Sequence, residues 1–242
     1  MNIKFTIEYK GTNYCGWQIQ KDQSTIQGEL TNAFQILFPN EKINIIGSGR
    51  TDAGVHAYGQ VASVQLPDQL ELSKVFKSIN GIISHDIFIK DYEIVNNDFN
   101  ARYSAKIRMY QYFINQKFSP FTLDTAWHVN ESLNYELLEK CASLLIGEHD
   151  FSSLSRHNPD IINKNCTIFE SFWDINNDNL IFTIKSNRFL HHMVRFIIGS
   201  SIEVAKIKIN ISDFSDMINN VTTKSPLCAP SKGLFLYEVL YD

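Results

Sequence analysis

An aspartate beside an arginine, within a glycine-containing stretch, is the feature of this sequence best suited to chemistry. The stretch GSGRTDAGVH (47–56) places Asp52 two residues after Arg50. Glycines allow tight backbone turns and close approach by a ligand. A neighbouring cation favours the ionised carboxylate, so Asp52 is a candidate nucleophile or base. The simpler alternative is a turn in which the Asp and Thr side chains satisfy loop amides.

His56 follows Asp52 by four residues, and an Asp–His pair can support hydrolysis. No G-x-S-x-G elbow or other recognisable nucleophile accompanies the pair. We therefore interpret His56 as a residue that stabilises the loop or contacts RNA.

A second candidate is the cationic stretch RFLHHMVRFIIG (188–199). The sequence predicts a helix over 188–206 with Asn187 as its N-cap. Four side chains at i, i+3, i+4 and i+7 then share one face: Arg188, His191, His192 and Arg195. This face is either simply solvated or contacts phosphate. Adjacent helical residues point about 100° apart, so the two histidines are poor joint metal ligands and no metal is expected.

The strand predicted at KIRMYQYFINQ (106–116) alternates, which puts Arg108, Tyr110, Tyr112 and Ile114 on one face. An arginine and two tyrosines on a sheet face can stack on nucleobases. Ordinary strand packing with buried tyrosine rings explains the pattern equally well.

Composition limits the class of protein. The chain has 242 residues and a net charge of −4. A negative net charge is not typical of nucleic-acid-binding domains, but it permits a local basic surface. No apolar run approaches the roughly 20 residues of a membrane span, and the alternating start MNIKFTIEYK predicts a strand rather than a signal peptide. We expect a cytoplasmic protein without membrane association. Its four scattered cysteines indicate neither disulfides nor a zinc site.

The predicted elements fall into two halves, 1–104 and 105–242. The first has strands at 2–9, 43–48, 59–66 and 86–95, with helices after a Ser24–Gln27 capping box and around 72–79. This β-α-β-β-α-β order is ferredoxin-like, and an α+β fold is expected. The second half is predicted to repeat the order. Its helices are predicted at 137–145 with Gly147 as C-cap, at 188–206, and after a Ser212 cap with Val221 inward; its last strand is predicted at 233–241.

Six segments together resemble the tRNA pseudouridine synthase A (TruA) family. They are YKGTNYCGWQIQ (9–20), STIQGEL (24–30), GSGRTDAGVHAYGQVA (47–62), FNARYSAKIRMYQY (99–112), NRFLHHMVRFIIG (187–199) and APSKGLFLYEVLY (229–241). The R-T-D-A-G-V-H motif is highly specific to that family. The resemblance implies two RRM-like α/β halves with a mainly antiparallel sheet and a central cleft. It also implies isomerisation of uridine to pseudouridine at positions 38, 39 and 40 of the tRNA anticodon stem-loop, by a homodimer and without a cofactor.

The resemblance also implies residue roles. Asp52 matches the essential nucleophile, Tyr110 the tyrosine that stacks on the target base, and Arg195 the arginine that keeps the nucleophile ionised. Arg50 is expected to hold the flipped nucleotide. The implied substrate-binding residues also include His56, Arg108, Arg188 and His192, and Arg102, Lys106 and Arg156 extend the expected basic surface.

The chain departs from the family pattern at two places. Lys10 replaces the acid of the usual Y-D-G-T, and residues 152–168 match only loosely. Two other functions remain open at this stage: an RNA-binding module without catalysis, and an Asp/His hydrolase. Pure binding needs no carboxylate near phosphates, and a metal-dependent hydrolase would need clustered acids.

Overall fold

A computed structural model describes residues 1–222 and 224–242 and divides them into two compact units. The first unit comprises Met1–Lys106 and Phe235–Asp242, and the second comprises Ile107–Leu234. This differs from the sequence division at residue 104, which placed the whole C-terminal strand with the second half. The C-terminal strand joins the first unit because it pairs there with a strand of the first half.

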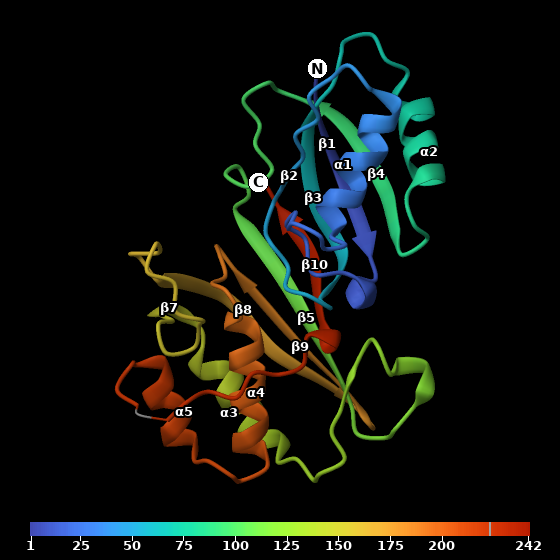
Figure 1. The fold of residues 1–242 in the computed structure, drawn as a ribbon. Helices are drawn as coiled ribbons and strands as arrows, with labels where there is room; N and C mark the ends of the chain where they lie inside the picture. The colour runs from blue at the N-terminus through green and yellow to red at the C-terminus, as the bar shows by residue number, and fades with distance from the viewer. Residues whose placement is uncertain (223) are drawn as a thin grey trace. The chain divides into compact units, whose positions relative to one another are not determined.

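The sheet of the first unit has the strand order β4-β1-β3-β10 (Figure 1), with a short β2 (Ile46–Gly47) beside β3. Strands β4 (Ile87–Val95), β1 (Asn2–Tyr9) and β3 (His56–Gln65) pair antiparallel. Strand β10 (Leu234–Leu240) pairs parallel with the start of β3. The β-α-β-β-α-β order predicted for 1–104 is present.

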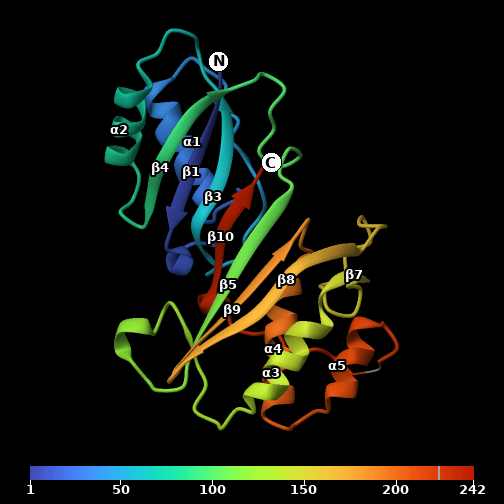
Figure 2. The same ribbon diagram turned by 180° about the vertical axis from the view of Figure 1, so that it is seen from behind.

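Helices α1 (Ile26–Leu37) and α2 (Leu72–Ile82) cover one face of this sheet, as the two opposite views show (Figures 1 and 2). Their apolar stripes meet the sheet at Phe5, whose ring centroid lies 5.7 Å from those of both Phe34 and Phe76. All three rings are buried, so the core of the unit lies between helices and sheet. Thr25, not Ser24, caps α1, because its hydroxyl accepts a hydrogen bond from the Gly28 amide.

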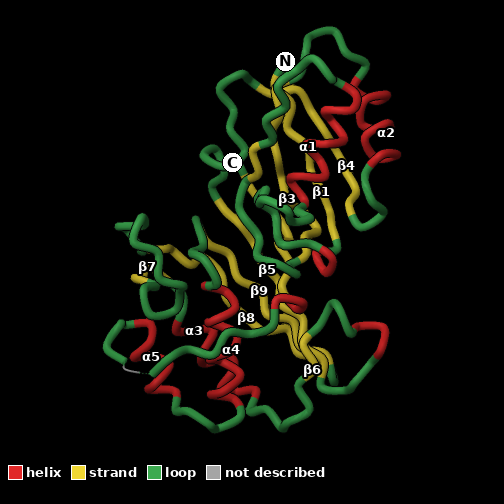
Figure 3. The backbone as a smooth tube through the Cα atoms, in the orientation of Figure 1, coloured by secondary structure: helices red, strands yellow, loops and turns green. Residues whose placement is uncertain are grey.

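The second unit has a sheet of order β5-β9-β8-β7, with β6 (Trp127–His128) parallel to the end of β5 (Figure 3). Strands β5 (Ile107–Asn115), β9 (Asn179–Ser186), β8 (Asn165–Asn176) and β7 (Gly147–Asp150) pair antiparallel. Most of the strand pairs in both units are antiparallel, so the fold is α+β as predicted.

In the described residues of the second unit there are three α-helices: α3 (Tyr135–Leu144), α4 (Met193–Ala205) and α5 (Ile211–Ile218). Helix α4 is its most buried helix, and α3 and α5 both contact it. Short 3-10 turns lie at Gly11–Asn13, Pro120–Thr122 and Ser231–Gly233. None of the helices in the described residues is long and apolar enough to cross a membrane.

Several predicted boundaries of the second half were wrong. Helix α3 ends at Leu144 with Leu145 as its C-cap, and Gly147 instead begins β7. Asn210 caps α5 through a capping box with Asp213, two residues before the predicted Ser212. Val221 lies beyond α5 and is 69% exposed, so it is not part of the core.

Candidate functional site

The Asp52 loop connects β2 to β3 in the first unit. Its ends are held by backbone hydrogen bonds: Ser48 N donates to Val61 O (2.8 Å), and Val55 N donates to Asp52 O (3.1 Å). Thr51 is buried, Asp52 is half-buried and Arg50 is exposed. The carboxylate is thus carried on a fixed turn, and the guanidinium two residues earlier can reach solvent or a substrate.

The segment YKGTNYCGWQIQ braces this loop from the side. Trp17 N donates to Thr51 O (3.1 Å), and Gly54 N donates to Tyr14 O (3.2 Å). Gly16 has φ of +88°, and a Cβ added there would lie 2.5 Å from Thr51 O. Glycine is therefore required at 16, both for the left-handed backbone and for the close approach.

Buried polar side chains fix the backbone on both sides of Arg50. The hydroxyl oxygens of Tyr9 and Thr51 are 2.8 Å apart in a buried hydrogen bond. Gln60, which is fully buried, accepts from the Ser48 hydroxyl (2.6 Å) and donates to Gly49 O (2.9 Å). Burial raises the pKa of Tyr9 well above its usual value, so this hydroxyl stays protonated. Such satisfied buried networks rigidify the backbone that they bind.

His56 is fully buried, and its Nδ1 accepts a hydrogen bond from the Gly11 amide (3.1 Å). Its ring stacks on Phe235 with centroids 4.5 Å apart. This geometry favours the loop-stabilising interpretation. Contact with RNA, the other expectation for His56, is at odds with a side chain that has no exposed surface.

Lys10, which stands where the resembled family has an acid, is exposed at the start of the bracing segment. The next residue, Gly11, packs so closely on the loop that an added Cβ would lie 2.0 Å from Val55 O. The role of this motif in the structure is therefore carried by its glycine and by the backbone.

In the second unit, Tyr110 and Tyr112 lie on the same face of β5, as the alternation predicted. Tyr112 has no exposed surface, and its hydroxyl donates to Pro230 O (2.8 Å). It is a packed core residue, so of the two interpretations of this strand the packing one applies to Tyr112. Tyr110 is 9% exposed and meets the edge of Phe189, with ring centroids 5.0 Å apart at 87°.

Arg195 lies in the first turn of α4 and is clamped to the segment before β10. Its Nε donates to Ala229 O (2.8 Å), while Ala229 N donates to Arg195 O (3.0 Å). Gly199 allows this close packing, since an added Cβ would lie 2.1 Å from Leu227 O. Burial raises the pKa of Tyr112, and the charge of Arg195 opposes that rise. Arg195 is therefore a well-positioned cation beside Tyr112.

The predicted helical face of Arg188, His191, His192 and Arg195 does not exist, because α4 begins only at Met193. Asn187 is not an N-cap. Its backbone N–H donates to Thr167 O (3.2 Å), and its side-chain Oδ1 accepts from Thr167 N (3.0 Å), so both groups bond to β8 instead of to the helix. His192 then adopts φ of +61°, outside the right-handed helical region. The rings of His191 and His192 lie 4.2 Å apart, so the 100° argument about their directions does not apply.

In the second unit, three of the predicted binding residues lie on connected segments. Arg108 donates from Nη1 to Asn187 O (3.0 Å), which links β5 to the segment holding Arg188 and His192. Both of these side chains are half-buried.

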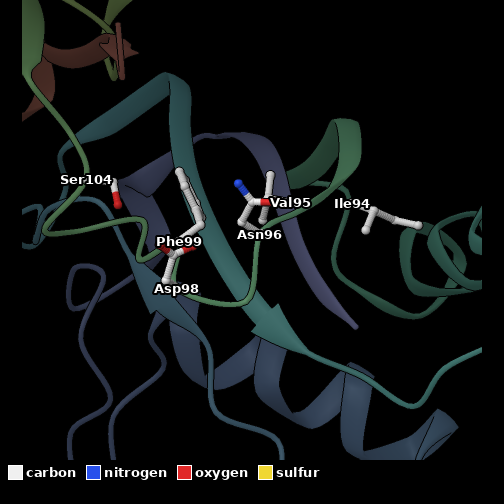
Figure 4. Close-up of a pocket in the computed structure, with 6 residues that line it drawn as sticks. All are labelled: Ile94, Val95, Asn96, Asp98, Phe99 and Ser104. Atoms are coloured by element: carbon white, nitrogen blue, oxygen red, sulfur yellow. The ribbon is translucent and has the colours of Figure 1, made fainter.

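A surface depression at the end of β4 (Figure 4) contains none of the predicted site residues. It is lined by Ile94, Val95, Asn96, Asp98, Phe99 and Ser104.

Sequence reasoning missed three positioning residues: Tyr9, Gln60 and Phe189. The signal for Gln60 was present, because this glutamine directly precedes the mostly apolar stretch VASV (61–64), and glutamine is seldom buried in a strand. Tyr9 and Phe189 carried no such signal, since aromatic residues are common in any core.

The chain is similar to known proteins over nearly its whole length. A family model described as tRNA pseudouridine synthase matches residues 6–104 and 141–242. A tRNA pseudouridine synthase A of Dictyoglomus thermophilum is 40% identical over 249 residues, covering 100% of both chains. The tRNA pseudouridine synthase A 1 of Protochlamydia amoebophila is 38% identical, covering 99% of this chain and 96% of its own.

A tRNA pseudouridine synthase A of a Thermoanaerobacter species is 36% identical, covering 99% of both chains. Among solved structures, a chain titled "Crystal Structure of a Cbf5-Nop10-Gar1 Complex" aligns with a TM-score of 0.32 and 10% identity over 85% of this chain and 54% of that chain. This structural likeness is too weak to carry an argument. The family assignment rests on the sequence matches over nearly the full chain.

Proposed function

Because this chain belongs to the tRNA pseudouridine synthase family and is an isomerase acting on tRNA, we propose that it modifies uridines 38, 39 and 40 of the anticodon stem-loop with Asp52 as nucleophile. In this reaction the bond between N1 and C1′ breaks, the uracil turns, and C5 bonds to C1′. N1 gains a proton and C5 loses one to solvent. No electron leaves or enters, so the isomerisation is balanced without an external oxidant or reductant.

The observation that carries the Asp52 assignment is that the Asp52 loop is held in place by contacts from several other segments. Glycines 11 and 16, the Tyr9–Thr51 hydrogen bond and the Gln60 amide all act on residues 48–55. A carboxylate that reacts with the bound nucleotide gains most when its position is set before substrate binds. The turn interpretation of Asp52 needs no such bracing.

Arg195 and Tyr110 take the remaining catalytic roles in this proposal. Arg195, oriented by Ala229, is the cation that favours the ionised form of the nucleophile. Tyr110 stacks on the target uracil once the nucleotide has left the stem, with Phe189 fixing the ring plane. Arg50, which is exposed on the Asp52 loop, holds the flipped nucleotide.

Substrate binding rests on a basic surface within an acidic chain. Arg108, Arg188 and His192 belong to connected segments of the second unit and supply its contacts to phosphate. We assign the active protein as a homodimer. We place it in the cytoplasm, where its tRNA substrate is processed. No metal or cofactor has a part in the proposed chemistry.

Mapping pseudouridine in an unmodified tRNA transcript tests this function. Carbodiimide adducts stop primer extension at pseudouridine, so incubation with the protein should create stops at position 38, 39 or 40. Stops confined to other positions would contradict the assigned target, and a transcript without any stop would contradict the activity. Light scattering should give twice the mass of one chain.

A further inference from the structure

The loop of residues 155–164, SRHNPDIINK, which we call the cationic loop, presents an isoleucine to solvent. Ile162 is 98% exposed. The turn before it is ordered by Asn158, whose side-chain oxygen accepts from Asp160 N (2.9 Å) and whose carbonyl accepts from Ile161 N (3.3 Å). The side chain therefore projects from a defined turn.

The cationic loop is anchored on the segment that leads into α4. Arg156 N donates to His191 O (2.9 Å), and Phe151 N donates to Lys164 O (3.2 Å). Other loop side chains line a small depression with Leu190 and His191. Because Arg195 lies four residues after His191, the loop is attached directly to a segment that carries proposed catalytic and binding residues.

The charge around Ile162 distinguishes it from Phe121, which is exposed to a similar degree. Arg156 and Lys164 outnumber the one acid of the loop, Asp160, and leave it with a net charge of +1 in a chain of net −4. Within the part of the chain that the structure describes, neither cation forms an ion pair. Phe121 is similarly exposed, at 94%, but the nearby Lys117 is paired with Asp178 at 2.7 Å.

Exposure of a single apolar residue is ordinary and by itself decides nothing. An apolar side chain flanked by unpaired cations has a specific use on nucleic acid, however. Proteins insert such side chains between base steps while cations hold the adjacent phosphates. A base inside a stem has to leave its stack before its glycosidic bond can be reached, and unstacking is costly.

We infer that Ile162 is an unstacking wedge, which enters the anticodon stem-loop beside the target uridine while Arg156 and Lys164 contact the backbone. This inference rests on the proposed function and adds a residue that opens the stem. Ile162 promotes exposure of the target and takes no part in bond making.

The test compares Ile162→Ala with wild type in single-turnover reactions on two stem-loop RNAs. In one the target uridine is paired, and in the other a mismatch opposite the target has already weakened the stack. We expect Ile162→Ala to be about tenfold slower on the paired RNA and within about threefold of wild type on the mismatched RNA. Ile162→Met, which keeps an apolar wedge, should restore most of the rate.

Phe121→Ala is the matched control, because it removes a similarly exposed apolar side chain from the 3-10 turn Pro120–Thr122 of the same unit. It should match wild type on both RNAs. Equal rates for Ile162→Ala and wild type on the paired RNA would overturn the inference. So would an equal loss on both RNAs, which would indicate a general binding or folding defect.

A second readout separates this inference from the proposed function. 2-Aminopurine placed next to the target uridine becomes brighter when it unstacks, whether or not pseudouridine forms. Brightening by wild type but not by Ile162→Ala supports the wedge even if no product appears, which would refute only the proposed function. Product formation with the same brightening for both proteins would refute only the wedge.

Discussion

The hydroxyl oxygen of Tyr9 lies 2.8 Å from that of Thr51, in a buried hydrogen bond that joins the end of β1 to the residue preceding Asp52. The contact links residues 42 positions apart in sequence and stabilises the Asp52 loop from its buried side. It makes the position of the proposed nucleophile depend on a hydroxyl that cannot itself reach substrate.

Tyr9→Phe should therefore lower both stability and turnover. Removing the hydroxyl leaves the buried Thr51 oxygen without this partner, which costs about 1 kcal/mol of unfolding free energy. Urea denaturation measures that loss, and initial rates at saturating tRNA measure the effect on turnover. Tyr237→Phe, at a half-exposed tyrosine of the same unit, is the control and should change neither. A Tyr9→Phe protein with wild-type turnover would show that the loop keeps its geometry without the bond.

Two glycines of the same region should respond differently to alanine. Gly16→Ala forces a Cβ to within 2.5 Å of Thr51 O at a φ of +88°, so the Asp52 loop has to move. An alanine at Gly49 meets nothing within 4 Å. We expect Gly16→Ala to lose at least about 90% of turnover because small misplacements of reacting groups are costly. Gly49→Ala should retain most of it, and equal losses in both proteins would count against the bracing role of residues 9–17.

Tyr110→Phe separates the tyrosine's ring from its hydroxyl. The ring contact with Phe189 is kept in this variant, so stacking on the base should survive. Normal single-turnover rates would assign Tyr110 to stacking alone, as we expect, and Tyr110→Ala should then be slow. A slow Tyr110→Phe protein with unchanged tRNA affinity would instead place the hydroxyl in a proton-transfer step.

The buried cysteines give a prediction about pH. Burial raises the pKa of Cys141 to about 12 and that of Cys166 to about 11, so neither thiol ionises near neutral pH. The folded chain holds these protons more tightly than the unfolded chain does. Their contribution to stability is therefore complete below pH 9 and is lost as pH rises through 11 and 12.

A thiol reagent at pH 8 should accordingly label native protein in two stages. Cys15 and Cys228, both half-buried, should react first. Cys141 and Cys166 should react only after denaturant is added. Four thiols that react at one rate in the native protein would mean that the second unit opens readily.

Alternation and helical periodicity were enough to predict most of the fold. Phe5, Phe34 and Phe76 fall on the faces that their spacing indicates, and these faces form the core of the first unit. The pairing of β10 with β3 was not predictable, because local pattern does not say which distant strand a segment joins. The predicted start of α4 was wrong for a related reason. The residues RFLHH have helical spacing, yet Asn187 is bonded to Thr167 and His192 adopts φ of +61°, so the helix begins only at Met193.

The candidate site was predictable as a set of motifs but not as a geometry. Asp52 stood out because of Arg50 and the surrounding glycines, and the family resemblance supplied its role. Nothing in local sequence joins Tyr9 to Thr51 or Arg195 to Ala229, since these contacts come from tertiary packing.

The central claim is that Asp52 performs the chemistry, and tritium release from tRNA labelled with [5-³H]uridine tests it most directly. Wild type and Asp52→Asn are compared with EDTA present, together with tRNA binding by both. Forming the C5–C1′ bond expels the hydrogen at C5, so we predict release by wild type only, with binding retained by Asp52→Asn. Release by Asp52→Asn at more than a few per cent of the wild-type rate would contradict the account.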